Sequence, residues 1–242
     1  MSAVSVSGLV LAAGDHELVH GVDFSVEPGE ALGIVGESGS GKSLTLRAVL
    51  GLLPRGITRE GGSIAVDGRA GMVFQEPLSA LDPLMTAGAQ VAEVCRHVRG
   101  MPRAASRERV RELFALVGLP EDRIRRYPHE LSGGQRQRVV IAIALAAEPD
   151  VLLCDEPTTA LDVTVQAQVL ALLDRLRREL GLALVFVSHD VAVVAQMCSR
   201  VLVMRDGIVV ERGATLDVIG EPRDAYTRAL LDAVLPLPEA ER

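Results

Sequence analysis

The sequence contains no tryptophan, six tyrosine and phenylalanine residues, three cysteines and one lysine. The odd number and wide spacing of the cysteines exclude a disulfide framework and a zinc knuckle, and are typical of reduced thiols. Long apolar runs are absent too: the longest, Val139 to Ala147, has nine residues, whereas a membrane-spanning helix needs about 20. The first residues lack the charged and apolar regions of a signal peptide. We therefore expect a cytosolic globular protein rather than a secreted or integral membrane protein.

An excess of basic charge is missing as well. The chain has 25 basic and 32 acidic side chains, a formal net charge of −7, which excludes a generally basic nucleic-acid binder. With 242 residues, 48% of them hydrophobic, the chain can bury a sizeable core. This length suits one compact domain, or one domain with a subdomain.

Strand-like and helical segments alternate along the chain. Predicted strands cover residues 5–11, 22–26, 31–35, 63–66, 71–74, 151–154, 183–187 and 201–204, and predicted helices cover 42–53, 87–98, 106–117, 133–147 and 163–180. Such alternation indicates an α/β fold with a mostly parallel sheet. Helices interrupt the alternation between residues 76 and 147. We therefore predict a single domain, 1–242, with an α/β core (1–75 and 148–220), a helical subdomain (76–147) and a closing helix and tail (221–242).

The one lysine stands in a glycine- and serine-rich loop between a predicted strand and a predicted helix. This loop matches the pattern G-x-x-x-x-G-K-[ST] and consists of Gly36, Glu37, Ser38, Gly39, Ser40, Gly41, Lys42 and Ser43. Glycines let backbone N–H groups curl around phosphates, and the helix N-terminus adds a favourable dipole. We expect Lys42 to reach the β- and γ-phosphates of a nucleotide and the Ser43 hydroxyl to bind Mg²⁺.

Polar side chains follow three further apolar strands. Asp155 and Glu156 end one of them, Gln75 another and His189 a third. Ligands of α/β sheets bind beyond the carboxyl ends of the strands. We therefore expect Asp155 to hold Mg²⁺ through water, Glu156 to act as a base, Gln75 to bind Mg²⁺ or the attacking water, and His189 to reach the γ-phosphate.

A second candidate anion site starts the helix after residue 131. Ser132, Gly133, Gly134 and Gln135 offer a hydroxyl and exposed N–H groups at a helix N-terminus. From physical chemistry alone, an ordinary helix N-cap is the better account of these residues. However, one nucleotide does not need two phosphate-cradling helix starts in one chain, and two half-sites that meet in a dimer would explain both.

In their order along the chain, these motifs resemble those of the ATP-binding-cassette (ABC) ATPases, P-loop NTPases with a RecA-like core and an inserted helical subdomain. The loop from Gly36 to Ser43 is similar to the Walker A motif, Gln75 to the Q-loop, and Leu131 to Gln135 to the signature motif. The strand ending in Asp155 and Glu156 is similar to Walker B. Asp162 stands where the family has its D-loop, and His189 where it has the switch histidine.

The resemblance implies an ATPase that uses ATP and Mg²⁺, with Glu156 and His189 as catalytic residues and Ser43, Gln75 and Asp155 around the metal. It also implies a dimer in which Ser132 to Gln135 cover the ATP of a second ATPase subunit, usually a different chain. Further expected partners are two membrane permease subunits and, indirectly, an extracytoplasmic solute-binding protein, but no nucleic acid. The expected location is the cytoplasmic face of a bacterial inner membrane.

Three segments narrow the resemblance to the peptide/nickel importer branch: Tyr127 to Gly134, Asp155 to Asp162 and the closing Ala225 to Leu231. Residues 11–16 offer no aromatic side chain to stack on adenine, Gln75 follows Lys42 by only 33 positions, and no cysteine-bearing tail follows. These features are similar to the nickel-type members. We therefore expect uptake of nickel or a metal chelate; di- or oligopeptide import is the alternative, and a soluble non-transport ABC ATPase is a further one.

Overall fold

Residues 2–234 are described in the computed structural model, and they form two compact units. The first unit holds residues 2–67 and 183–234, and the second holds residues 68–182. The subdomain boundaries predicted from the sequence divide the chain differently and stay a prediction. The end of the predicted closing segment, 235–242, lies outside the described residues.

An antiparallel sheet opens the first unit. It consists of β1 (Val4–Ala13), β2 (His16–Val26) and β4 (Ile57–Val66), with β1 in the middle. Val4 pairs with Val26 on one side and with Val66 on the other. Gly62, at φ +78°, allows a bulge opposite Gly8, where a Cβ would lie 2.3 Å from the Gly8 carbonyl oxygen. The "mostly parallel" expectation therefore does not extend to these first strands.

Four more strands of the first unit lie in the order β7 (Ala183–Ser188), β3 (Ala31–Val35), β8 (Arg200–Arg205) and β9 (Ile208–Ala214). The β3 strand pairs in parallel with both β7 and β8, whereas β9 pairs antiparallel with β8. Every residue of β3 and β7 is buried. This burial explains why both strands are continuous apolar runs in the sequence.

Helices of the first unit cover these strands: α1 (Lys42–Val49), α7 (Val191–Met197), α8 (Thr215–Gly220) and α9 (Ala225–Val234). The α7 helix packs closely on β3, because a Cβ at Gly33 would lie 2.2 Å from Val194 Cγ1. The α1 helix is shorter than the predicted 42–53, since the chain turns at Gly51 with φ +68°.

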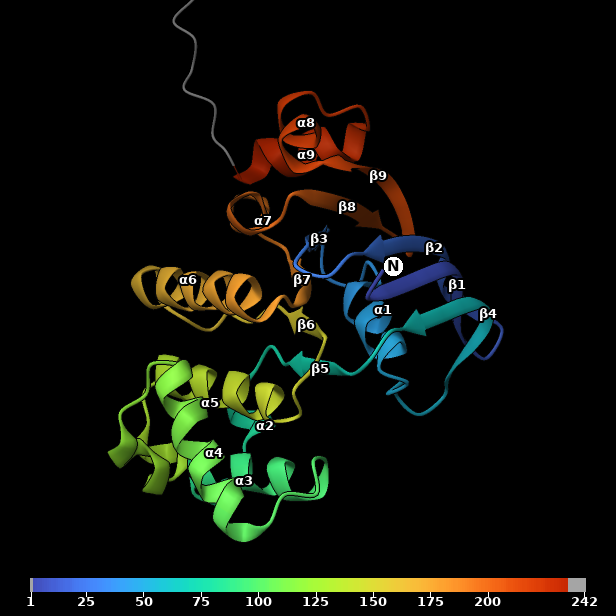
Figure 1. The fold of residues 1–242 in the computed structure, drawn as a ribbon. Coiled ribbons are helices and arrows are strands. Elements are labelled where there is room, and N and C mark those ends of the chain that lie inside the picture. Colours follow the sequence, from blue (N-terminus) through green and yellow to red (C-terminus); the bar gives the residue numbers. More distant parts are fainter. Residues whose placement is uncertain (1, 235–242) are drawn as a thin grey trace, which may run out of the picture. The chain divides into compact units, whose positions relative to one another are not determined.

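In the second unit, the strands β5 (Ala70–Val73) and β6 (Val151–Asp155) pair in parallel. Its helices are α2 (Pro77–Ala80), α3 (Ala87–His97), α4 (Arg103–Leu116), α5 (Gly133–Ala146) and α6 (Val163–Leu180), with 3₁₀ turns at Glu121–Arg125 and Pro128–Glu130. The α3, α4 and α5 helices lie side by side, drawn in green (α3 and α4) and yellow-green (α5) in Figure 1.

The helices of the second unit are tied together at the carboxyl end of α4. Arg138 on α5 donates to the Val117 carbonyl (2.7 Å), and Arg175 on α6 donates to the Leu116 carbonyl (2.6 Å). These guanidinium groups satisfy carbonyls that a helix C-terminus leaves without partners. Among residues 2–234, no helix combines the length and the apolar character needed to cross a membrane.

Candidate functional site

The glycine-rich loop lies between a buried strand and a helix start, as predicted. It leaves β3 after Val35 and enters α1 at Lys42. Gly41 precedes the helix at φ +96°, and no side chain caps the helix. The first N–H groups of α1 thus keep the orientation that suits an anion. A Cβ at Gly39 would meet nothing within 4 Å, so the loop surface is open there.

Lys42 is the buried cation of this loop. Its side chain is only 4% exposed, and Nζ donates to the carbonyls of Gly36 and Glu37, both at 2.7 Å, and to Ser40 Oγ at 3.4 Å. A buried ammonium needs such partners. Its compact, three-donor geometry explains why lysine persists here in a chain that otherwise uses arginine.

Asp155 and Glu156 stand at the end of β6, in the second unit. Asp155 is the last residue of the strand and is 3% exposed. Glu156 follows at φ +45°, a left-handed conformation that is uncommon for a residue with a side chain. Its Oε2 accepts from Thr159 Oγ1 (3.0 Å) and from Gln75 Nε2 (3.3 Å).

Gln75 lies two residues after β5 and is exposed. The hydrogen bond to Glu156 confirms that the ends of β5 and β6 bring these two predicted residues together, although 81 positions separate them. An amide and a carboxylate in contact can orient one water molecule between them and a substrate.

His189 follows β7 in the first unit. The strand ends at Ser188, and α7 begins at Val191 with Asp190 as its N-cap, accepting from the Ala192 N–H (2.8 Å). The exposed His189 therefore sits at the carboxyl end of a parallel strand, as predicted.

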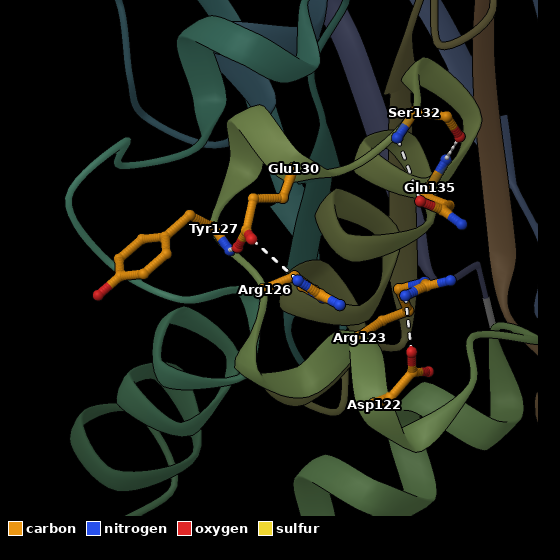
Figure 2. Close-up of polar contacts among 7 residues, drawn as sticks. All are labelled: Asp122, Arg123, Arg126, Tyr127, Glu130, Ser132 and Gln135. Carbon is orange, nitrogen blue, oxygen red and sulfur yellow. Dashed lines mark hydrogen bonds and ion pairs between the residues drawn. The ribbon is translucent and has the colours of Figure 1, made fainter.

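The predicted signature residues form the start of α5 (Figure 2). Ser132 Oγ accepts from the Gln135 N–H (3.3 Å), and Gln135 Oε1 accepts from the Ser132 N–H (3.1 Å). This reciprocal capping box confirms the ordinary N-cap reading. The N–H groups of Gly133 and Gly134 are not part of this capping box. The box is therefore compatible with the hypothesis that this helix start binds an anion.

The turn before the signature is braced by Glu130. Its carboxylate accepts from the Tyr127 N–H (2.8 Å) and from Arg126 Nη1 (3.0 Å), as Figure 2 shows. The Tyr127 N–H, and secondarily Arg126, hold the pKa of the Glu130 carboxyl below its usual range. The Tyr127 ring is 40% exposed and stacks on His129.

Asp162 is the N-cap of α6, and its Oδ1 accepts from the Val165 N–H (2.9 Å). The α6 helix packs against the signature helix, because a Cβ at Gly134 would lie 2.5 Å from Val165 Cγ1. The predicted D-loop residue therefore has a structural role in positioning the helix that borders the signature.

Each unit thus carries part of the predicted residue set. The first unit holds Lys42, Ser43 and His189, and the second holds Gln75, Asp155, Glu156, Asp162 and Ser132 to Gln135. Within residues 2–234, no three histidine, cysteine, aspartate or glutamate side chains cluster as a metal cage. Hydroxyl, amide and carboxylate oxygens are nevertheless suited to Mg²⁺, which binds through one or two side chains together with phosphates.

Comparison with known proteins gives consistent results. A family model described as "ABC transporter" matches residues 19–159, more than half of the chain. The "Probable peptide ABC transporter ATP-binding protein" of Sinorhizobium fredii is 44% identical over 88% of this chain and 70% of its own length. The oligopeptide transport ATP-binding protein OppD of Bacillus subtilis is 44% identical over 90% of this chain. The chain spans only 66% of that relative.

A solved structure with the same fold is a dimeric ATP-binding cassette in a post-hydrolysis state, bound to ADP and Pi. It is 30% identical, with a TM-score of 0.75 over 88% of this chain and 98% of the other.

Proposed function

Because this chain belongs to the ABC transporter family and is an ABC ATPase, we propose that it is the ATP-hydrolysing subunit of a bacterial importer of dipeptides or oligopeptides. The proposed cargo is supported by the relatives. Proteins named for peptide and oligopeptide transport share 44% identity with this chain over about nine-tenths of its length.

The phosphates of ATP bind to the loop from Gly36 to Ser43. Lys42, Ser43 and the N–H groups at the start of α1 supply the positive end of a helix and a cation. Ser43 and Gln75 would hold Mg²⁺, with Asp155 acting through water; the ion would neutralise charge on the phosphates.

Glu156 acts as the base that positions and deprotonates the attacking water. Its contacts with Gln75 and Thr159 fix the carboxylate, and a base must be held in place before the proton moves. His189 stabilises the charge that develops on the γ-phosphate. Phosphoryl transfer depends mainly on such positioning and charge.

The second half of each site comes from another ATPase subunit, a copy of this chain or a different one. Ser132 to Gln135 of that subunit would cover the ATP bound to Lys42. Closing and opening of the pair would drive two permease subunits at the cytoplasmic face of the inner membrane, with a solute-binding protein outside. The segment after Gln75, about residues 76–98, is the proposed contact with the permease.

Nickel or metal-chelate uptake was the first expectation from the sequence, and the relatives favour its alternative. The nickel expectation depended on several features of the sequence, and the short spacing between Lys42 and Gln75 is one of them. In the proposed mechanism both residues act on ATP and Mg²⁺, so their spacing does not specify a cargo.

The test is cellular uptake with Lys42→Ala in place of the native residue, using labelled di- and tripeptides and labelled nickel in parallel. We expect peptide uptake to fall to background and nickel uptake to stay unchanged. Arg55→Ala, which removes an exposed basic side chain outside the site, is the control and should transport normally. Loss of nickel uptake alone would instead support the hypothesis of nickel or metal-chelate import. No change in peptide uptake or in nickel uptake would indicate a non-transport ABC ATPase.

A further inference from the structure

The second residue of the phosphate-binding loop, Glu37, has both its backbone N–H and its backbone carbonyl hydrogen-bonded. The Glu37 carbonyl accepts from Lys42 Nζ at 2.7 Å, within the loop. The Glu37 N–H donates to the hydroxyl oxygen of Tyr226 at 2.9 Å. Tyr226 lies 189 positions further along the chain, on the closing helix α9. One end of the loop is therefore tied to the last described helix.

Tyr226 is itself firmly placed. Its side chain is 8% exposed, and the Arg205 guanidinium lies 5.0 Å from the centre of its ring. Burial raises the pKa of the Tyr226 phenol, so the hydroxyl stays neutral at physiological pH. A neutral hydroxyl can accept the Glu37 N–H and keep its own proton.

The start of α9 is also anchored to the strand β9. The Glu211 carboxylate accepts from the N–H groups of Arg223 (2.8 Å) and Asp224 (3.1 Å). Asp224 Oδ1 then accepts from the Tyr226 N–H at 2.8 Å. These contacts fix the turn that presents the phenol to the loop.

The end of β8 and the turn that follows it also contact the loop. The Gly207 N–H donates to the Ser40 carbonyl at 3.2 Å. A Cβ at Gly36 would lie 2.0 Å from the carbonyl oxygen of Met204, so the loop and the end of β8 are in close backbone contact. Tyr226 therefore completes a support that holds both the beginning and the middle of the loop.

We propose that Tyr226 is a positioning residue for nucleotide binding: its hydroxyl fixes the backbone of Glu37, and through it Lys42 and the loop N–H groups, in the arrangement that phosphates require. The closing helix α9 thereby sets nucleotide affinity without touching the nucleotide. The proposal rests on the proposed ATP site. A loop that is already ordered loses less conformational freedom on binding, so affinity rises.

The test is ATPase kinetics of Tyr226→Phe, which deletes one oxygen and keeps the packed ring. We expect the KM for ATP to rise about fivefold, since one hydrogen bond contributes about 1 kcal/mol. The kcat at saturating ATP should stay within about twofold, because the chemical groups are untouched. The chain's other tyrosine supplies the matched control: Tyr127→Phe alters an exposed ring in the second unit and should leave KM unchanged.

A second measurement uses the wild-type sequence, in case Tyr226→Phe is poorly folded. With 3-fluorotyrosine in place of both tyrosines, the ¹⁹F resonance that remains in the Tyr127→Phe variant belongs to Tyr226. We expect it to shift when ADP is added. An unshifted resonance together with an unchanged KM would overturn the positioning role, as would a fall in kcat alone. If the wild-type chain bound no ATP, the proposed function would fail instead.

Discussion

At the scale of single residues, Glu156 has a backbone conformation that its residue type disfavours. Its φ of +45° is left-handed. Such a conformation costs on the order of 1–3 kcal/mol, so it persists only where the surrounding structure enforces it. The residue before it, Asp155, is buried at the end of β6. The Glu156 carboxylate is held by Gln75 and Thr159. Strain next to a fixed carboxylate is typical of an active site.

Replacement of Glu156 by glutamine removes the basic carboxylate but keeps the size and shape of the side chain. Both hydrogen bonds converge on one oxygen, Oε2, and a single amide oxygen can accept both. We therefore expect Glu156→Gln to fold and to bind ATP like the wild-type chain. Its ATPase turnover should fall by about 10²-fold or more, the usual effect of losing a general base. Steady-state ATPase assays and nucleotide titration check both parts.

The matched control is Glu179→Gln, which changes an exposed carboxylate on α6 paired with Arg175. Surface pairs of this kind contribute about 1 kcal/mol or less, so turnover should not change. Glu156→Gln with retained turnover would mean that another group takes the proton. Loss of ATP binding would mean that the carboxylate positions the nucleotide instead.

At the scale of elements, the start of α5 combines a packing role with a proposed binding role. Gly134 lies so close to Val165 on α6 that a Cβ would approach to 2.5 Å, whereas a Cβ at Gly133 would be in ordinary contact, 3.4 Å from Leu161 Cδ2. The two glycines are adjacent on one helix, so their replacement by alanine separates packing from binding.

We expect Gly134→Ala to be destabilised by the clash with Val165, with a lower unfolding midpoint. Gly133→Ala should keep or raise the midpoint, because alanine favours a helix over glycine by up to about 1 kcal/mol. Its ATPase activity should nevertheless fall, since a methyl group keeps the phosphate of the partner's ATP away from the helix N–H groups. Thermal unfolding and ATPase assays of the two variants check this. Full activity in Gly133→Ala would show that the start of α5 acts only as an ordinary N-cap and does not bind phosphate.

Elements with strong local signals were predicted well. The β3 strand and the α6 helix have the predicted limits, since β3 is an apolar run between turns and α6 has Asp162 before it and Gly181 after it. The β9 strand and the α7 helix were missed. Seven-residue elements give little periodicity, and β9 owes its pairing to β8 rather than to its own pattern.

Candidate site residues were predicted from motifs, but their contacts were not. The lone lysine and the carboxylates at the end of β6 stood out in the sequence, because each follows a buried strand. The hydrogen bond from the Glu37 N–H to the Tyr226 hydroxyl spans 189 positions. No local sequence pattern predicts a contact over such a separation. Likewise, the sequence alone did not predict the two reciprocal hydrogen bonds between Ser132 and Gln135 that form the capping box.

At the scale of the whole molecule, the proposed mechanism needs two subunits. The loop with Lys42 belongs to the first unit and the signature to the second, and the proposal assigns them to different ATP molecules. A solved relative in the post-hydrolysis state is dimeric. If copies of this chain share sites, two inactive variants should complement each other.

The pair to mix is Lys42→Ala and Gly133→Asp. The first variant loses the phosphate-binding cation. The second places a carboxylate at a helix start, where the dipole favours it and where it repels phosphate. Each should be inactive alone. In a mixed dimer, one site carries both defects and the other carries neither, so we expect the mixture to recover up to about a quarter of wild-type ATPase activity, as random pairing of copies allows. Recovery should also increase with protein concentration. A wild-type chain that is active alone while the mixture stays inactive would show that each chain completes its own site; activity that appears only with a different ATPase chain would make that chain the partner.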